Sequence, residues 1–83
     1  MIWNVVLHKK ANKDLEKFTD SERIRESLRH LSQFPDVKNM LRIEDNLYRL
    51  RIGEYRALFK VYDTEHLIVI IHIDVRGKIY KNL

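Results

Sequence analysis

The stretch that decides the fold runs from residue 47 to residue 62 and reads LYRLRIGEYRALFKVY. Apolar and polar residues alternate over 47–52 and again over 55–62, which is typical of half-buried β-strands. Gly53 and Glu54 separate the two runs, and a glycine at the first central position suits a two-residue type II′ turn. The stretch therefore predicts an antiparallel β-hairpin.

This turn also fixes which residues lie opposite each other across the hairpin. Ile52 is expected to pair with Tyr55, and Arg51 with Arg56, so that members of a pair share one face of the sheet. One face is then apolar and predicts the core, through Tyr48, Leu50, Ile52, Tyr55, Ala57, Phe59 and Val61. The other face is strongly cationic, with Arg49, Arg51, Arg56 and Lys60 beside Leu47, Leu58 and Tyr62.

The residues before the hairpin predict a strand and two helices. Residues 2–7 (IWNVVL) are β-branched and aromatic, which favours a strand. Residues 10–18 carry apolar side chains at helical spacing and predict a short amphipathic helix. Thr19 and Glu22 fit a capping box that begins a second helix, and Phe34 before Pro35 ends that helix. The apolar positions of the two helices are Ala11, Leu15, Phe18, Ile24, Leu28 and Leu31.

The remaining segments are a connector and a last strand. Residues 37–46 show no clear period, so they are expected to be a connector anchored by Met40, Leu41 and Ile43. Residues 67–75 (LIVIIHIDV) are almost continuously apolar, which favours a strand that is covered on both faces or central in the sheet. Gly77 is expected to end it.

The order of these elements predicts an α+β fold in a single domain over residues 1–83. We expect an N-terminal strand, a two-helix hairpin and then a three-stranded antiparallel meander, with the helices packed on one face of the sheet. The 83 residues include no cysteine, which excludes a thiol nucleophile and a cysteine-based zinc site. The longest apolar run, 67–71, is too short to span a membrane, and the N-terminus lacks a signal-peptide layout. The protein is therefore expected in the cytoplasm, with no membrane partner.

The cationic face is the first candidate site. The net charge of +4 is spread evenly along the chain, so placement rather than total charge is informative. Arg51 opposite Arg56 brings like charges together, which destabilises a sheet and is not explained by folding. Guanidinium groups match phosphate oxygens, so the arginines of this face predict a clamp for an RNA or DNA backbone. Alternatively, they pair with acidic residues of this chain or of a partner.

The second candidate is the C-terminal segment 74–81 (DVRGKIYK), where Arg76, Lys78 and Lys81 flank Tyr80. A tyrosine among cations can stack on a base or transfer a proton. In the alternative reading, Ile79 and Tyr80 belong to a frayed tail and only cap the core. The side of the sheet reached by Arg76 also stays open. If the connection over 63–66 has an even number of residues, regular alternation puts Arg76 on the core side. A connection of odd length, a bulge in the last strand, or a position of Arg76 beyond the end of that strand would remove this conflict.

Other polar residues give weaker signals. The four histidines, His8, His30, His66 and His72, show no metal-ligand spacing and no paired carboxylate, so they are interpreted as ordinary surface or strand-end residues. The lysines of the first helix, Lys9, Lys10, Lys13 and Lys17, are interpreted as its solvated side. No metal site and no cofactor are predicted.

The hairpin with the sequence YRLRIGEYRALF, followed by IDVR at 73–76 and by Tyr80, resembles the RelE/ParE toxin superfamily over almost the whole chain. The C-terminal arginine and tyrosine are similar to those of the RelE-like ribonuclease branch. This resemblance implies a toxin with a RelB-like antitoxin as its partner, and the ribosome and mRNA as its targets. It also implies cleavage of mRNA in the ribosomal A site without metal, by attack of a ribose 2′-OH on the adjacent phosphate.

The resemblance also implies roles for single residues. Arg49 and Arg51 occupy the basic strand positions, Arg56 the phosphate-stabilising position after the turn, and Arg76 the position after the last strand. Some relatives have lysine where this chain has Arg49 and Arg51, and arginine, unlike lysine, does not release its proton to act as a base. Tyr80 is therefore the remaining candidate to orient or deprotonate the 2′-OH. Lys60, Lys78 and Lys81 are expected to bind nucleic acid. The alternatives are a ParE-like toxin that poisons DNA gyrase without cutting RNA, or an inactive relative that binds antitoxin.

Overall fold

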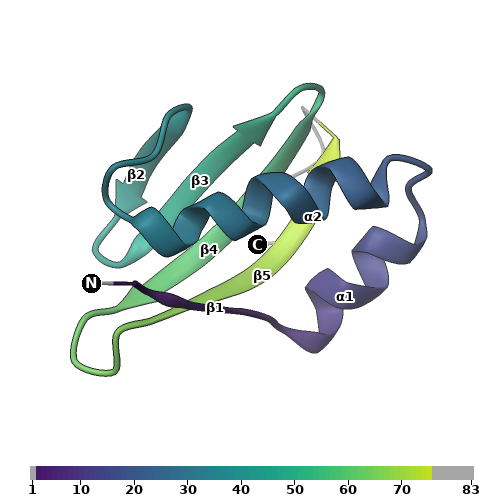
Figure 1. The fold of residues 1–83 in the computed structure, drawn as a ribbon. Coiled ribbons are helices and arrows are strands. Elements are labelled where there is room, and N and C mark those ends of the chain that lie inside the picture. Colours follow the sequence, from purple (N-terminus) through teal and green to yellow (C-terminus); the bar gives the residue numbers. More distant parts are fainter. Residues whose placement is uncertain (1, 76–83) are drawn as a thin grey trace.

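The computed structural model describes residues 2–75, which form one mixed β-sheet and the helices beside it. In chain order, the elements are β1 (Asn4–Leu7), α1 (Lys9–Glu16), α2 (Ser21–Arg29), the 3-10 helix η1 (His30–Gln33), β2 (Met40–Glu44), β3 (Leu47–Ile52), β4 (Tyr55–Tyr62) and β5 (Leu67–Val75). The spatial order of the strands is β1-β5-β4-β3-β2 (Figure 1). Only β1 and β5 pair in parallel among these strands, and the three other pairs are antiparallel.

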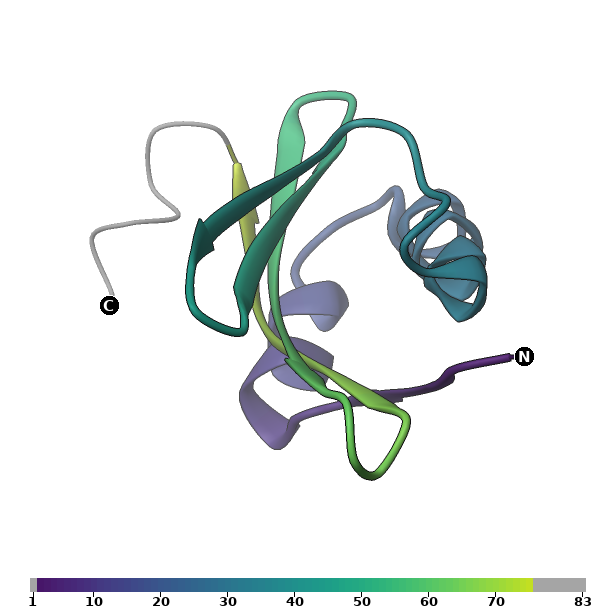
Figure 2. The same ribbon diagram turned by 90° about the vertical axis from the view of Figure 1, so that its left-hand side faces the viewer.

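Within residues 2–75, the helices lie on one side of the sheet (Figure 2). α2 and η1 lie over the middle of the sheet, and α1 packs against β5 and β1. This is the α+β arrangement that the order of elements predicts, with the helices on one face. The meander β3-β4-β5 is also confirmed.

The hairpin register is confirmed at every predicted pair, from Tyr48 opposite Phe59 to Ile52 opposite Tyr55. Gly53 has a φ of 59°, a region that side chains with a Cβ rarely adopt, and this value fits the first central position of a type II′ turn. A Cβ at this position would also meet the guanidinium of Arg23 from α2. The turn therefore needs glycine for its backbone conformation and for the close approach of α2.

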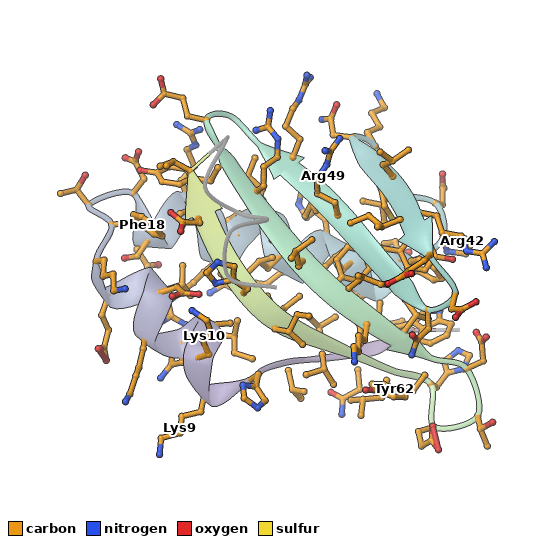
Figure 3. The ribbon with its side chains drawn as sticks, turned by 180° about the vertical axis from the view of Figure 1, so that it is seen from behind. Lys9, Lys10, Phe18, Arg42, Arg49 and Tyr62 are labelled. Atoms are coloured by element: carbon orange, nitrogen blue, oxygen red, sulfur yellow. The ribbon has the colours of Figure 1, made fainter. Side chains whose placement is uncertain are left out.

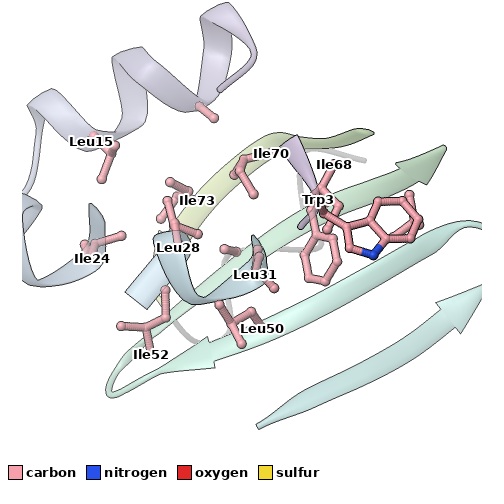
Figure 4. Packing of buried hydrophobic residues seen from close by; sticks show 14 residues of the cluster. Trp3, Leu15, Ile24, Leu28, Leu31, Leu50, Ile52, Ile68, Ile70 and Ile73 are labelled. Carbon is pink, nitrogen blue, oxygen red and sulfur yellow. The ribbon is translucent and has the colours of Figure 1, made fainter. Parts of the chain in front are cut away.

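The core lies between the helices and the apolar face of the hairpin (Figure 4). Leu15 of α1 and Leu28 of α2 meet Phe59 of β4 and Ile70 of β5, and all four are buried. Aromatic rings fill the end of the core nearest the N-terminus, where Trp3, Phe34, Tyr48 and Phe59 make edge-to-face and stacked contacts with centroids 5.2 to 6.5 Å apart. The core residues predicted on β3 and β4 all belong to this cluster or pack against it.

The predicted connector at 37–46 is wrong, because Met40–Glu44 form the edge strand β2. This strand pairs antiparallel with β3, with Met40 opposite Leu50 and a register shift between Arg42 and Glu44. Most of its side chains are exposed, including the apolar Leu41 and Ile43. A bulged strand with little burial shows no alternation, which explains why the sequence pattern did not reveal it.

The predicted capping box is also wrong. The N-cap of α2 is Asp20, and its side chain makes no capping hydrogen bond. The Asp20 carboxylate instead accepts a hydrogen bond from the hydroxyl of Tyr55, at 3.3 Å, so it joins the start of α2 to the hairpin. Desolvation and the negative charge of Asp20 raise the pKa of this phenol above its ordinary value. The first strand is shorter than predicted, and the second helical region ends at Gln33, just before Phe34.

Within residues 2–75, no helix is long and apolar enough to cross a membrane.

Candidate nucleic-acid interface

The predicted cationic face lies on the side of the sheet away from α2, where Figure 3 labels Arg49. Arg49 and Arg51 come from β3, and Arg56 and Lys60 come from β4. Arg51 lies directly opposite Arg56, and Arg49 lies opposite Leu58. The structure therefore brings these four basic residues to one face, as alternation along the hairpin requires.

Arg56 is far less exposed than a surface position suggests, with only 8% of its surface accessible. Its Nη1 donates hydrogen bonds to the backbone carbonyls of Gly53, at 3.1 Å, and Tyr55, at 3.0 Å. A guanidinium carries five N–H donors in a planar fork, and these two bonds fix the orientation of the group. Arg56 is thus held by the turn rather than extended into solvent.

Arg51 is exposed and takes a different direction. Its Nη2 lies 3.4 Å from the Oδ1 of Asn39, and its backbone N–H donates to the carbonyl of Asn39 at 2.9 Å. Asn39 has a φ of 63°, a conformation that asparagine tolerates better than most residues. The chain just before β2 therefore holds Arg51 from both its backbone and its side chain.

An open pocket at the turn end of the sheet contains both arginines. Its lining residues are Asn39, Arg51, Gly53, Glu54, Arg56 and Val75. Two guanidinium groups in one pocket attract a phosphate and can donate several charge-assisted hydrogen bonds to it. Glu54 is the acidic member of this set, and it belongs to the turn.

A bulge in β5 adds a carboxylate to the same face. Phe59 pairs with Ile70 but Leu58 pairs with His72, so Ile71 is an extra residue in the strand. The shift keeps Ile70 and Ile73 on the core side and puts Asp74 directly opposite Arg56. The sequence analysis considered a bulge in this strand as one way to move Arg76 away from the core side. It did not predict that Asp74 would lie beside the arginines.

His72 contradicts the interpretation of the histidines as surface or strand-end residues. It is 4% exposed, and its Nδ1 lies 2.7 Å from Oδ2 of Asp14, which is itself buried on α1. Burial raises the pKa of Asp14, but hydrogen bonds from the Ile73 N–H and His72, with the charges of His72 and Lys10, outweigh it and lower the pKa. The helical spacing of α1 could have shown Asp14 on its apolar side, between Ala11 and Leu15.

The other predicted basic residues lie in the first helical region, which the structure describes, and in the C-terminal segment, which it does not. The lysines of α1 are exposed, as predicted, and Lys10 also approaches Asp14 at 3.5 Å. Arg76, Lys78, Tyr80 and Lys81, together with Gly77, lie outside the described residues. No group of three side chains suited to a metal ion occurs over residues 2–75.

Comparisons with known proteins agree with this fold. The family model described as "ParE toxin of type II toxin-antitoxin system, parDE" matches residues 5–80. A Methanocaldococcus jannaschii protein provisionally named toxin RelE1 is 33% identical over 90 residues, which cover 99% of each chain.

Two solved structures have the same architecture. One is the archaeal RelE-RelB complex from Pyrococcus horikoshii, with a TM-score of 0.81, 26% identity, and coverage of 94% of this chain and 99% of the other. The second is the toxin-antitoxin complex RelBE2 from Mycobacterium tuberculosis, with a TM-score of 0.80, 23% identity, and coverage of 93% and 94%. The family match, the relative and the shared fold together identify the chain as a member of the RelE/ParE superfamily, the toxins of toxin-antitoxin systems.

Proposed function

We propose that this toxin is a ribosome-dependent endoribonuclease that cuts mRNA in the cytoplasm without a metal ion. The observation that carries the proposal is the open pocket in which Arg51 and Arg56 lie together. Directly opposed arginines repel each other across a sheet, and an anion bound by both guanidinium groups offsets that repulsion. A phosphodiester supplies that anion, and it fits the fork-shaped donors of both groups.

The proposed chemistry is transesterification within the RNA chain. The ribose 2′-oxygen forms a bond to the adjacent phosphorus, the bond from phosphorus to the 5′-oxygen breaks, and the product ends in a 2′,3′-cyclic phosphate. The 2′-OH proton passes to the phenolate form of Tyr80, which we propose as the base, and the leaving 5′-oxygen takes a proton from water. Arg51, Arg56 and Arg76 offset the negative charge that develops on the phosphate oxygens, which is commonly the largest catalytic effect.

The other basic residues have supporting roles in this proposal. Arg49 lies along β3 from the pocket, and Lys60 follows on β4, so both can contact phosphates on either side of the cut. Lys78 and Lys81 are proposed to do the same from the C-terminal segment. These contacts add affinity but do not select a sequence.

A RelB-like antitoxin is the proposed partner. The P. horikoshii and M. tuberculosis relatives were solved as toxin-antitoxin complexes. In this chain, the edge strand β2 exposes Leu41 and Ile43, which are 53% and 37% accessible, next to the arginine-bearing strand β3. An acidic, helical antitoxin would cover these apolar side chains and neutralise the arginines.

A second candidate is a ParE-like toxin that inhibits DNA gyrase and leaves RNA intact, because the matching family model is that of ParE toxins. The two functions are distinguished by mapping mRNA 5′ ends after induced expression of the wild type, Arg56→Ala and Arg42→Ala. Arg42 is an exposed arginine of β2 outside the pocket, so it is the matched control.

The nuclease predicts new 5′-hydroxyl ends on ribosome-bound mRNA with the wild type and with Arg42→Ala, and none with Arg56→Ala. Growth arrest with intact mRNA and broken or supercoiling-deficient DNA would instead establish the gyrase function. Full toxicity of Arg56→Ala would contradict the nuclease proposal.

A further inference from the structure

A second hollow, the α2-β2 hollow, lies beside the pocket of Arg51 and Arg56. It forms where the chain passes from η1 to β2, because β2 begins only at Met40, opposite Leu50. Its volume is about 540 Å³, which lies in the range of sites for small molecules. The lining residues are Ser27, His30 and Gln33 of the helices, residues 36–39 of the loop, and Leu50 and Arg51 of β3.

The α2-β2 hollow and the pocket of Arg51 and Arg56 share two lining residues, Asn39 and Arg51. Arg51 is exposed, and its Nη2 lies 3.4 Å from the Oδ1 of Asn39. The two spaces therefore meet at one guanidinium group. A ligand that occupies both needs an anionic part beside Arg51 and a polar ring system beyond it. A nucleotide of an RNA strand has these two parts.

The lining of the α2-β2 hollow differs from that of the pocket beside it, because it mixes hydrogen-bond donors and acceptors. Gln33 offers an amide with both, Asp36 offers acceptors and Lys38 offers donors, and all three residues are exposed. His30 adds an exposed aromatic ring, on which an RNA base can stack. Unpaired RNA bases are recognised by such stacking and by hydrogen bonds to their edges. The hollow thus suits a base better than a second phosphate.

Asp36 is the acidic residue among those that line the α2-β2 hollow. Its backbone N–H donates to the carbonyl of Gln33 at 2.9 Å, and the Val37 N–H donates to the carbonyl of Pro35 at 2.9 Å. These bonds tie the loop to the end of η1 and limit the positions that the carboxylate can reach. Like charges repel, so an acidic side chain beside a phosphate pocket lowers affinity unless it contacts the ligand itself. Asp36 therefore indicates a specific contact with the base.

The chemistry of the four RNA bases determines which one a carboxylate selects. A carboxylate accepts hydrogen bonds and donates none, and its two oxygens accept best from two adjacent N–H groups. Guanine presents such a pair, N1–H and the N2 amino group, on its Watson–Crick edge. Adenine, cytosine and uracil instead place an acceptor next to each donor on this edge, and that acceptor would repel a carboxylate oxygen.

We propose that the α2-β2 hollow binds the guanine base of a nucleotide next to the cut, and that Asp36 is the residue that selects it. This inference rests on the proposed nuclease function and adds the base for which the enzyme selects. The Asp36 carboxylate accepts from N1–H and from the N2 amino group, and Lys38 donates to O6 from the same hollow. Arg51 contacts the phosphate of this nucleotide, so the base and the backbone bind on either side of one side chain.

The test measures cleavage on programmed ribosomes with messages that differ only at the two nucleotides flanking the cut, each varied in turn among the four bases. We compare the wild type, Asp36→Asn and Asp63→Asn. Asp63 is an exposed acidic residue between β4 and β5 that lines neither space, so it is the matched control. The wild type and Asp63→Asn should cut messages with guanine at one of these positions about tenfold faster, because a bidentate contact to a base discriminates by about that factor.

Asp36→Asn gives the decisive comparison, because it changes hydrogen bonding with little change of shape. The amide offers one donor and one acceptor side by side, which match the N1 atom and the N6 amino group of adenine. The preference should therefore move from guanine to adenine at the same position, and the ratio of the two rates should change by at least about tenfold. Damage to the fold would lower all rates together and would not produce this reversal. Thermal melts of the three proteins should also agree, since both substituted residues are exposed.

Two outcomes of this experiment would overturn the proposal. One is a wild type that cuts without preference for guanine at either position, and the other is an Asp36→Asn variant that keeps the preference of the wild type. Either result would show that the Asp36 carboxylate does not select the base.

A second measurement does not need cleavage. It is an NMR titration of the free protein with 5′-GMP or 5′-AMP, each at millimolar concentration. The amide signals of residues 36–39 should shift more with GMP in the wild type and more with AMP in Asp36→Asn. Equal shifts with the two nucleotides would contradict the base subsite. If the wild type leaves mRNA intact while these signals distinguish the nucleotides, the nuclease function is refuted and the base subsite stands.

Discussion

Arg51 and Arg56 lie directly opposite each other across the β3-β4 hairpin, yet different parts of the chain hold their guanidinium groups. Arg56 turns back to the carbonyls of Gly53 and Tyr55, and Arg51 reaches Asn39 before β2. The divergence limits the repulsion between the two charges and leaves an open pocket between their anchoring points. The two arginines should therefore respond differently to substitution.

Arg56→Ala should abolish cleavage and also reduce stability. The variant loses two hydrogen bonds to backbone carbonyls, which is expected to cost about 2 kcal/mol of unfolding free energy, partly offset by relief of repulsion. Arg56→Lys keeps the charge but loses the planar fork, so we expect cleavage to fall by about a hundredfold. Chemical denaturation and cleavage kinetics measure the two effects separately. Wild-type cleavage by Arg56→Lys would show that charge alone suffices.

Arg51→Ala should lower cleavage without loss of stability. The side chain is exposed and its hydrogen bond to Asn39 is long, at 3.4 Å, so the unfolding free energy should change by less than about 0.5 kcal/mol. A decrease in stability similar to that of Arg56→Ala would mean that Arg51 supports the hairpin itself. Thermal melts of the two variants under identical conditions make the comparison.

Asp14→Asn should destabilise the protein by about 2 kcal/mol near neutral pH, because the charged hydrogen bond to His72 is lost and the Ile73 N–H keeps only a neutral acceptor. The pKa of Asp14 is lowered in the folded state, so its ionisation stabilises the fold above the unfolded pKa of about 4. That contribution disappears as the pH falls through the folded pKa. The difference in unfolding free energy between the wild type and Asp14→Asn should therefore narrow below about pH 4. A difference that stays constant down to pH 2 would contradict the assignment.

Gly53→Ala should destabilise the hairpin by about 1 to 2 kcal/mol, since alanine disfavours the positive φ of this position. The added methyl group also meets the guanidinium of Arg23, which has to move aside. Glu54→Ala, at the neighbouring turn position, is the matched control and should change stability by less than about 0.5 kcal/mol. Urea denaturation of both variants checks this expectation, which fails if the two lose the same stability.

The sequence was most informative in the hairpin, where the alternation of apolar residues and the glycine of the turn predict the same strand pairing. Alternation over β3 and β4, with Gly53 between them, determined the register, the core face and the arginine face. It failed for β2, where a bulge and exposed side chains such as Leu41 remove the periodicity. It also failed for His72 and Asp14, which lie 58 positions apart and meet only through the packing of α1 on β5. Contacts of this kind depend on tertiary structure, so local patterns do not reveal them.

Ile71 shows how much one inserted residue can change. Ile71 has no partner on β4, so the alternation of β5 shifts by one residue at this point. Ile68 and Ile70 face the core before the shift, and Asp74 lies opposite Arg56 after it. If Ile71 instead paired with Leu58 in a regular ladder, Ile73 would lie opposite Arg56 and Asp74 would lie opposite Tyr55, on the core face of the sheet. One strand thus contributes both to the hydrophobic core and to the face that carries the arginines.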